Sequence, residues 1–240
     1  MRSLPRWEHT HSLSNRISAG SRVVLGVLCV LSIVLVFGSA SNAFGQATVG
    51  RTLVVRSYNT MGVSLTTLEH AELTVQGLLE SAGISSGWRN CHTPDGPSAR
   101  SRDLCDDVLD ASEVIVRIVR TPRTIADPEA LGYSYVDPYR RQGTMATVFA
   151  DRVRSLAPTL RIDEGTLLGR AITHEVGHLL LGTLEHSETG LMRGTWNTPS
   201  RTNWLFSSAE ATRMHEGLAA RRADQPNAAP SALLAQGARR

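Results

Sequence analysis

Two histidines and a glutamate within five residues are the side chains best placed to do chemistry: His174-Glu175-Val176-Gly177-His178. On a helix, residues i and i+4 lie on one face, so both imidazoles can be directed at one point. The spacing suits a shared zinc ion at roughly 2.0–2.1 Å from a nitrogen of each ring. Glu175 lies about 100° further around the helix. This places its carboxylate beside the metal, where a general base for a metal-activated water belongs.

The residues around this motif predict the helix that such chemistry needs. Asp163 is a candidate N-cap with Glu164 in the first turn, and Gly182 falls where the helix would end. The apolar residues between them follow helical spacing: Leu167, Leu168, Ala171, Ile172, Val176, Leu179 and Leu180. A helix this apolar is mostly buried, and buried polar side chains cost free energy unless they are paired or bind a metal. The pattern favours a metal site over the alternative, histidines satisfied within an ordinary core.

A third metal ligand must come from outside the helix, because a catalytic zinc usually has three protein ligands and an open position for water. The nearest downstream candidate is His186. Glu210 is an alternative ligand, although a Ser207 or Ser208 cap would instead place it in the favourable first turn of a short helix. Three further side chains remain open as alternative ligands: Glu185, Glu188 and His215.

From His174 to Met192 the chain resembles the metzincin metalloproteases, closest to a bacterial secreted group. Their motif, H-E-x-x-H-x-x-G-x-x-H, adds a glycine that ends the helix and a third histidine on the returning chain, above a methionine turn. Here Gly182, His186 and the turn ending in Met192 match these features, and His186-Ser187 resembles the matrixin version. The glycine falls four residues after His178 instead of three, and the third histidine eight instead of six. The tyrosine that some metzincins carry after the methionine is absent.

The resemblance implies a zinc-dependent peptidase. His174, His178 and His186 would hold Zn²⁺, and Met192 would support the site from below without being a ligand. Glu175 would accept a proton from the metal-activated water and deliver it to the leaving amine. Two rival functions stay open: a zinc-binding domain without catalysis, and an interaction domain of the cell envelope. A hydrolase acting on a non-peptide amide would use the same chemistry.

The resemblance also implies an α+β fold of the zincin type, with a twisted mixed sheet packed on a backing helix and an active-site helix. In that family an edge strand ahead of the active-site helix binds the substrate, and residues 143–149 are the candidate, or else an ordinary sheet strand. The sequence pattern itself predicts strands at 51–58, 113–120 and 143–150, a helix at 66–82 and a short helical turn at 151–156.

The N-terminal segment predicts export. Its basic residues precede an uncharged apolar run at 23–37: Arg2, Arg6, Arg16 and Arg22. Cleavage candidates follow at 41–43 and 45–47, as in a secretory signal. An uncleaved anchor is the alternative, but the run of 15 residues is shorter than the about 20 that usually span a bilayer. We expect a signal peptide at 1–47 and a secreted or periplasmic protein.

Residues 48–222 are predicted to form one catalytic domain, and residues 223–240, which lack a periodic apolar face, a disordered tail. After Ala47 the chain holds 21 basic and 21 acidic residues. This balance gives no electrostatic basis for binding nucleic acid. We expect a peptide or protein substrate, and membrane contact only if the N-terminal segment is uncleaved.

Two cysteines outside the apolar run, Cys91 and Cys105, form an even pair in a chain predicted to be exported. They flank a segment rich in Pro, Gly, Ser and Arg, which predicts a disulfide worth about 3 kcal/mol through loop entropy. The alternative is a metal site that also uses His92. Cys29 lies within the apolar run and should leave with the signal.

Overall fold

The computed structural model describes residues 52–92, 105–196 and 203–224. The chain divides into two units, Met1–Thr48 and Val49–Arg240, and the described residues all belong to the second. The expected signal at 1–47 lies outside the described residues, and so does the predicted tail at 223–240 apart from its first two residues, which end the last helix. None of the helices within the described ranges is long and apolar enough to cross a membrane.

The described residues form a mixed five-stranded sheet with strand order β2-β1-β3-β5-β4. β1, β2, β3 and β5 run parallel, and β4 pairs antiparallel with β5. The strands are β1 (Thr52–Asn59), β2 (Ser85–His92), β3 (Glu113–Val119), β4 (Gly132–Asp137) and β5 (Gln142–Phe149). β1 and β3 are rich in buried β-branched residues because both lie inside the sheet.

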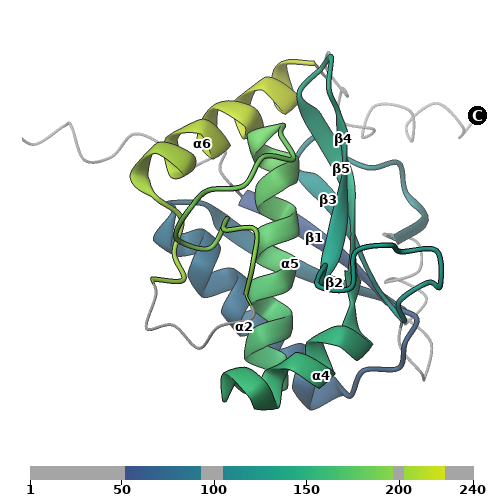
Figure 1. The fold of residues 1–240 in the computed structure, drawn as a ribbon. Helices are drawn as coiled ribbons and strands as arrows, with labels where there is room; N and C mark the ends of the chain where they lie inside the picture. The colour runs from purple at the N-terminus through teal and green to yellow at the C-terminus, as the bar shows by residue number, and fades with distance from the viewer. Residues whose placement is uncertain (1–51, 93–104, 197–202, 225–240) are drawn as a thin grey trace, which may run out of the picture. The chain divides into compact units, whose positions relative to one another are not determined.

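Helices cover this sheet, and one of them occupies the centre of the packing (Figure 1). The helices of the described residues are α2 (Leu65–Ser81), α4 (Ala150–Leu160), α5 (Glu164–Leu181) and α6 (Ser208–Ala223). α5 contacts α2, α4 and α6 as well as β4 and β5. Nearly every residue of α5 from Leu167 onward is buried. The predicted arrangement, a mixed sheet packed against helices, is confirmed at this level.

The helix that carries the histidines begins and ends at the predicted residues. The Asp163 carboxylate accepts a hydrogen bond from the backbone N–H of Thr166 at 2.9 Å, as an N-cap does. Gly182 follows the last turn with φ +64°, a left-handed conformation that disfavours side chains. The chain leaves the helix here toward His186.

Two strands were absent from the sequence prediction, and one assignment is wrong. β5 (Gln142–Phe149) is not an edge strand, because it lies between β3 and β4; the edge beside α5 is β4. The sequence of β4, GYSYVD, is short and begins with glycine, and β2 is polar at SSGWRNCH, so neither shows a continuous apolar run. α4 also extends beyond the predicted 151–156 and continues through Pro158 to Leu160.

The predicted disulfide between Cys91 and Cys105 is present, with the two Cα atoms 5.6 Å apart. It joins the end of β2 to the segment that leads into β3. Both cysteines are buried. The alternative metal site with His92 is therefore wrong for this pair, since both sulfurs are bonded to each other.

The C-terminal helix is tied to the sheet through one buried arginine. Arg221 of α6 is 4% exposed. Its guanidinium donates to the carbonyl oxygens of Ala111 at 2.9 Å and Glu113 at 2.8 Å, and also to that of Gly143. These bonds join α6 to the start of β3 and to β5. α6 is thereby held against α5, where its first turn reaches the loop of His186.

Gly182→Ala is expected to lower the free energy of unfolding by about 3 kcal/mol or more, which urea denaturation measures. A left-handed alanine costs about 1–2 kcal/mol, and its Cβ would also overlap the carbonyl oxygen of Arg141. Gly62→Ala is the matched control, because Gly62 has φ +72° with no atom within 4 Å of a Cβ. Equal losses in the two variants would show that the close approach to Arg141 has no energetic weight.

Candidate metal centre

The structure brings His174, His178 and His186 together. One nitrogen from each ring can be chosen so that all three lie within 4.8 Å of one another. His174 and His178 come from adjacent turns of α5, and His186 comes from the loop that follows it. The helical histidines are buried and His186 is exposed. This is the arrangement expected of a metal site with one side open to solvent.

The backbone around the site fixes which nitrogen of each helical histidine is free. Nδ1 of His174 lies 2.8 Å from the carbonyl oxygen of Leu191, and Nδ1 of His178 lies 2.9 Å from that of Thr183. A carbonyl oxygen only accepts, so each neutral ring carries its proton on Nδ1 and donates it. Nε2 of each ring is then left with an unshared lone pair, as in metal-binding histidines.

The two free nitrogens face each other across a distance that suits a shared ion. Nε2 of His174 and Nε2 of His178 are 3.1 Å apart. Since both are acceptors, they cannot hydrogen-bond to each other. Two nitrogens on a tetrahedral zinc are roughly 3.3 Å apart, from zinc–nitrogen bonds of about 2.0–2.1 Å. An all-imidazole donor set also suits Zn²⁺ better than Mg²⁺ or Ca²⁺. The residues present therefore fit zinc.

Burial keeps both helical histidines neutral at physiological pH. It lowers the pKa of His174 to about 3, with the neighbouring His178 adding to the effect. Burial likewise lowers the pKa of His178 to about 4, against the opposing hydrogen bond to Thr183. Metal ligands must be unprotonated to bind. These two rings therefore need not lose a proton at pH 7 before they bind a metal.

The loop that carries His186 is held through the next residue, Ser187. The backbone N–H of Ser187 donates to the carbonyl oxygen of Met192 at 2.9 Å, and the Ser187 hydroxyl donates to the Glu210 carboxylate. Glu210 also accepts from the backbone N–H of Ser207 at 2.7 Å in a capping box. Glu210 is thus occupied at the start of α6 and is not part of the histidine cluster.

Met192 packs beneath the histidine-bearing helix. The residue is 1% exposed, and its sulfur lies 2.6 Å from the position that a Cβ on Gly177 would take. Leu191, its neighbour, supplies the carbonyl that accepts from His174. The turn at 190–192 therefore supports the site through packing and through one hydrogen bond. The remaining alternative ligands, Glu185, Glu188 and His215, do not join the cluster, and His215 instead contacts the carbonyl of Ala82.

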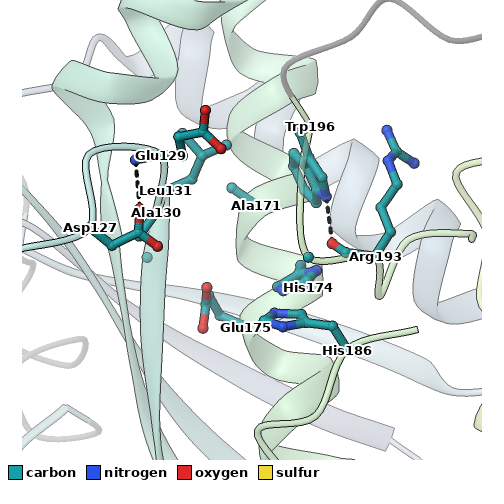
Figure 2. Close-up of a pocket in the computed structure, with 12 residues that line it drawn as sticks. Asp127, Glu129, Ala130, Leu131, Ala171, His174, Glu175, His186, Arg193 and Trp196 are labelled. Carbon is teal, nitrogen blue, oxygen red and sulfur yellow. Dashed lines mark hydrogen bonds between the residues drawn. The ribbon is translucent and has the colours of Figure 1, made fainter. Parts of the chain in front are cut away.

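Glu175 is buried beside the histidines with its carboxylate facing a small cavity (Figure 2). Burial raises its pKa to about 7, and a hydrogen bond from the Ser134 hydroxyl opposes the rise. The cavity has a volume of about 100 Å³, and it lies between the segment ahead of β4, with Asp127 and Glu129, and Trp196. A second cavity of about 580 Å³ shares Glu129 and Trp196 with the first.

Several residues that shape this site were absent from the sequence prediction. Ser134 and Gly132 contact Glu175 from β4, and Trp196 closes the opposite wall. The alternation of Tyr133, Ser134 and Tyr135 is a strand signal, but a short one. Without β4 in place, nothing in the sequence associates Ser134 with a glutamate 41 residues later.

Comparisons with known proteins add little to this geometry. Neither a protein-family model nor a curated protein matches the sequence. Among solved structures, the fold is similar to metalloproteinase-II from Bacteroides fragilis, with 17% sequence identity and a TM-score of 0.45. The match covers 72% of this chain and 55% of that one, so it spans little more than half of that protein. The candidate site therefore rests on its own geometry.

His186→Ala is expected to weaken zinc binding by at least about 100-fold, because loss of a ligand should exceed the 10- to 100-fold cost of losing an outer hydrogen-bond partner. Competition with a chromophoric chelator measures the affinity. Glu210→Gln is the control, since glutamine can keep the capping box but is a poor zinc ligand. A larger loss in Glu210→Gln than in His186→Ala would make Glu210 the third ligand.

Proposed function

We propose that this chain is a zinc-dependent peptidase of the metzincin-like kind, which hydrolyses peptide bonds with Glu175 as general base. One observation carries the proposal. The Nε2 atoms of His174 and His178 face each other at 3.1 Å with both ring protons held on Nδ1. Histidines satisfied within an ordinary core would have no reason to oppose two lone pairs, whereas a bound cation requires it.

Each site residue has a role in this mechanism. His174, His178 and His186 would hold zinc, which when bound activates a water and polarises the scissile carbonyl. Glu175 accepts a proton from the attacking water and later delivers it to the leaving amine. Burial raises the pKa of the Glu175 carboxyl, which favours its holding the proton between the two transfers. Met192 packs below and contributes no ligand.

The edge strand supports a peptide or protein as substrate. β4 pairs with β5 on one side, and within the described part of the chain no strand pairs with its other side. Gly132, at the start of β4, lines the cavity beside Glu175. An extended peptide added along this edge would bring its backbone past the metal ligands. The adjoining cavity of about 580 Å³ leaves room for a side chain next to the scissile bond.

The protein is proposed to act outside the cytoplasm, secreted or periplasmic. The disulfide between Cys91 and Cys105 supports this location, because disulfides persist in oxidising compartments. The basic and apolar pattern of residues 1–47 is a second, sequence-based support. Contact with a membrane is proposed only if that segment stays uncleaved, and no nucleic-acid partner is proposed.

A zinc-binding domain without catalysis is the alternative function. It is favoured by one feature, the eight-residue separation of His178 and His186, which is longer than the metzincin motif. In that case the metal would be bound and no peptide would be cleaved. The two functions therefore separate in a single assay of the zinc-loaded protein.

Glu175→Gln is expected to lower kcat by roughly 10²–10⁴-fold, the usual contribution of a general acid–base, while zinc stays bound. Loss of the carboxylate removes the proton acceptor but leaves the three histidines in place. Glu188→Gln changes an exposed carboxylate in the same loop region and should leave kcat unchanged. Near wild-type turnover by Glu175→Gln would rule out this mechanism.

A zinc chelator is expected to abolish cleavage of a mixed peptide library, and added Zn²⁺ should restore it, because the metal supplies the activated water. Mass spectrometry of the products would also reveal the preferred sequence. Folded, zinc-loaded protein that cleaves no peptide would instead support the non-catalytic alternative.

A further inference from the structure

We propose that Ser134 is a positioning residue for Glu175, which orients the carboxylate of the general base from the edge strand. This inference rests on the proposed peptidase function. Ser134 lies in the middle of β4 (Gly132–Asp137), and Glu175 lies on α5. The contact between them joins the strand proposed to bind the substrate to the side chain proposed to move the proton.

The hydrogen bond from Ser134 is short and buried. The Ser134 hydroxyl lies 2.7 Å from Oε2 of Glu175. Ser134 is 8% exposed and Glu175 6%, so little water competes for either group. No other hydrogen bond to this carboxylate is found within the described part of the chain. A buried carboxylate with one hydrogen bond depends on that bond for its orientation. Hydrogen bonds to charged groups are also stronger than those between neutral groups.

Gly132 constrains the same carboxylate from a second position. A Cβ on Gly132 would lie 2.9 Å from Oε1 of Glu175 and 3.0 Å from its Cγ. Gly132 and Ser134 are two residues apart on one strand and therefore share a face. With Oε2 bonded to Ser134 and Oε1 against the backbone of Gly132, β4 restricts rotation of the carboxylate. Oε1 is left as the oxygen that accepts the proton of the water.

The Ser134 hydroxyl can support Glu175 through both of its proton transfers. Besides Oε2, it lies 2.8 Å from the backbone carbonyl oxygen of Glu175. When the carboxylate is ionised, the hydroxyl donates to Oε2. When the carboxyl holds the proton on Oε1, Oε2 remains an acceptor, so the hydroxyl can keep the same hydrogen bond. The Ser134 hydroxyl therefore has an acceptor in both states.

A matched pair of variants isolates the hydroxyl from the shape of the side chain. Threonine and valine have nearly the same shape, and only threonine has a hydroxyl. Ser134→Thr should keep kcat within about threefold of the wild type. Ser134→Val and Ser134→Ala should each lower kcat by roughly 10- to 100-fold, the effect of losing a hydrogen bond to a charged group. KM for the same peptide and the bound zinc should not change, since neither depends on the carboxylate's orientation.

Crystal structures of the zinc-loaded variants give a second readout that does not depend on turnover. In Ser134→Thr the Glu175 carboxylate should keep its wild-type orientation, and in Ser134→Val and Ser134→Ala it should rotate or occupy two conformations. Ser134→Ala adds no atom, so it keeps the comparison valid if the extra methyl of the other two variants is not accommodated.

The outcomes separate the two proposals. If the wild type cleaves peptides while Ser134→Ala keeps wild-type kcat and carboxylate orientation, the role of Ser134 is wrong and the peptidase proposal stands. Equal kcat losses in Ser134→Thr and Ser134→Val would also overturn it, because the hydroxyl would then be irrelevant. If the zinc-loaded wild type cleaves no peptide, the peptidase proposal fails, and the role of Ser134 in peptide hydrolysis fails with it.

Discussion

The need to bury three polar side chains on one apolar helix governs the rest of this structure. α5 lies at the centre of the packing, so His174, Glu175 and His178 lose their water when the chain folds. Each is compensated by a group from another segment: the carbonyls of Leu191 and Thr183 and the hydroxyl of Ser134. Each buried polar group left without a hydrogen-bond partner would lower the stability of the fold by about 1–3 kcal/mol. The hydrogen bonds that orient the site side chains therefore also position the strand and the loop beside α5.

The loop that carries the Leu191 and Thr183 carbonyls is itself held by polar contacts. Ser187 joins the loop after α5 both to Met192 and to Glu210, the capping residue of α6. Arg221, near the other end of α6, donates to carbonyls at β3 and β5. The C-terminal helix therefore bridges the sheet and the loop of His186. A polar network of this kind specifies one arrangement more strongly than apolar packing does, because a partly satisfied network is costly.

Much of the centre of this fold could be predicted from the sequence, and the periphery could not. The helical spacing of α5, its Asp163 cap and its Gly182 end are local features, and each lies where it was expected. The gathering of the three histidines follows from i, i+4 spacing and a short return of the chain. β4 and β2 could not be recognised because an edge strand has one exposed side and therefore little apolar signal. Ser134 was hidden with β4, since its partner Glu175 is distant in sequence.

The three histidines are unequally buried, so the site has a buried side and a solvent side. His174 and His178 are fixed by helix and backbone, whereas His186 stands at the solvent side on a loop. A chelator would reach a bound ion from the His186 side, because the two helical rings are buried. The helical pair forms a permanent half of the site, already neutral and oriented, and the loop histidine closes the other half. The exchange rate of a bound ion would then depend on how fast this one exposed ligand dissociates. Of the two residues added relative to the metzincin motif, one lies between Gly182 and His186 and lengthens the loop that carries this ligand.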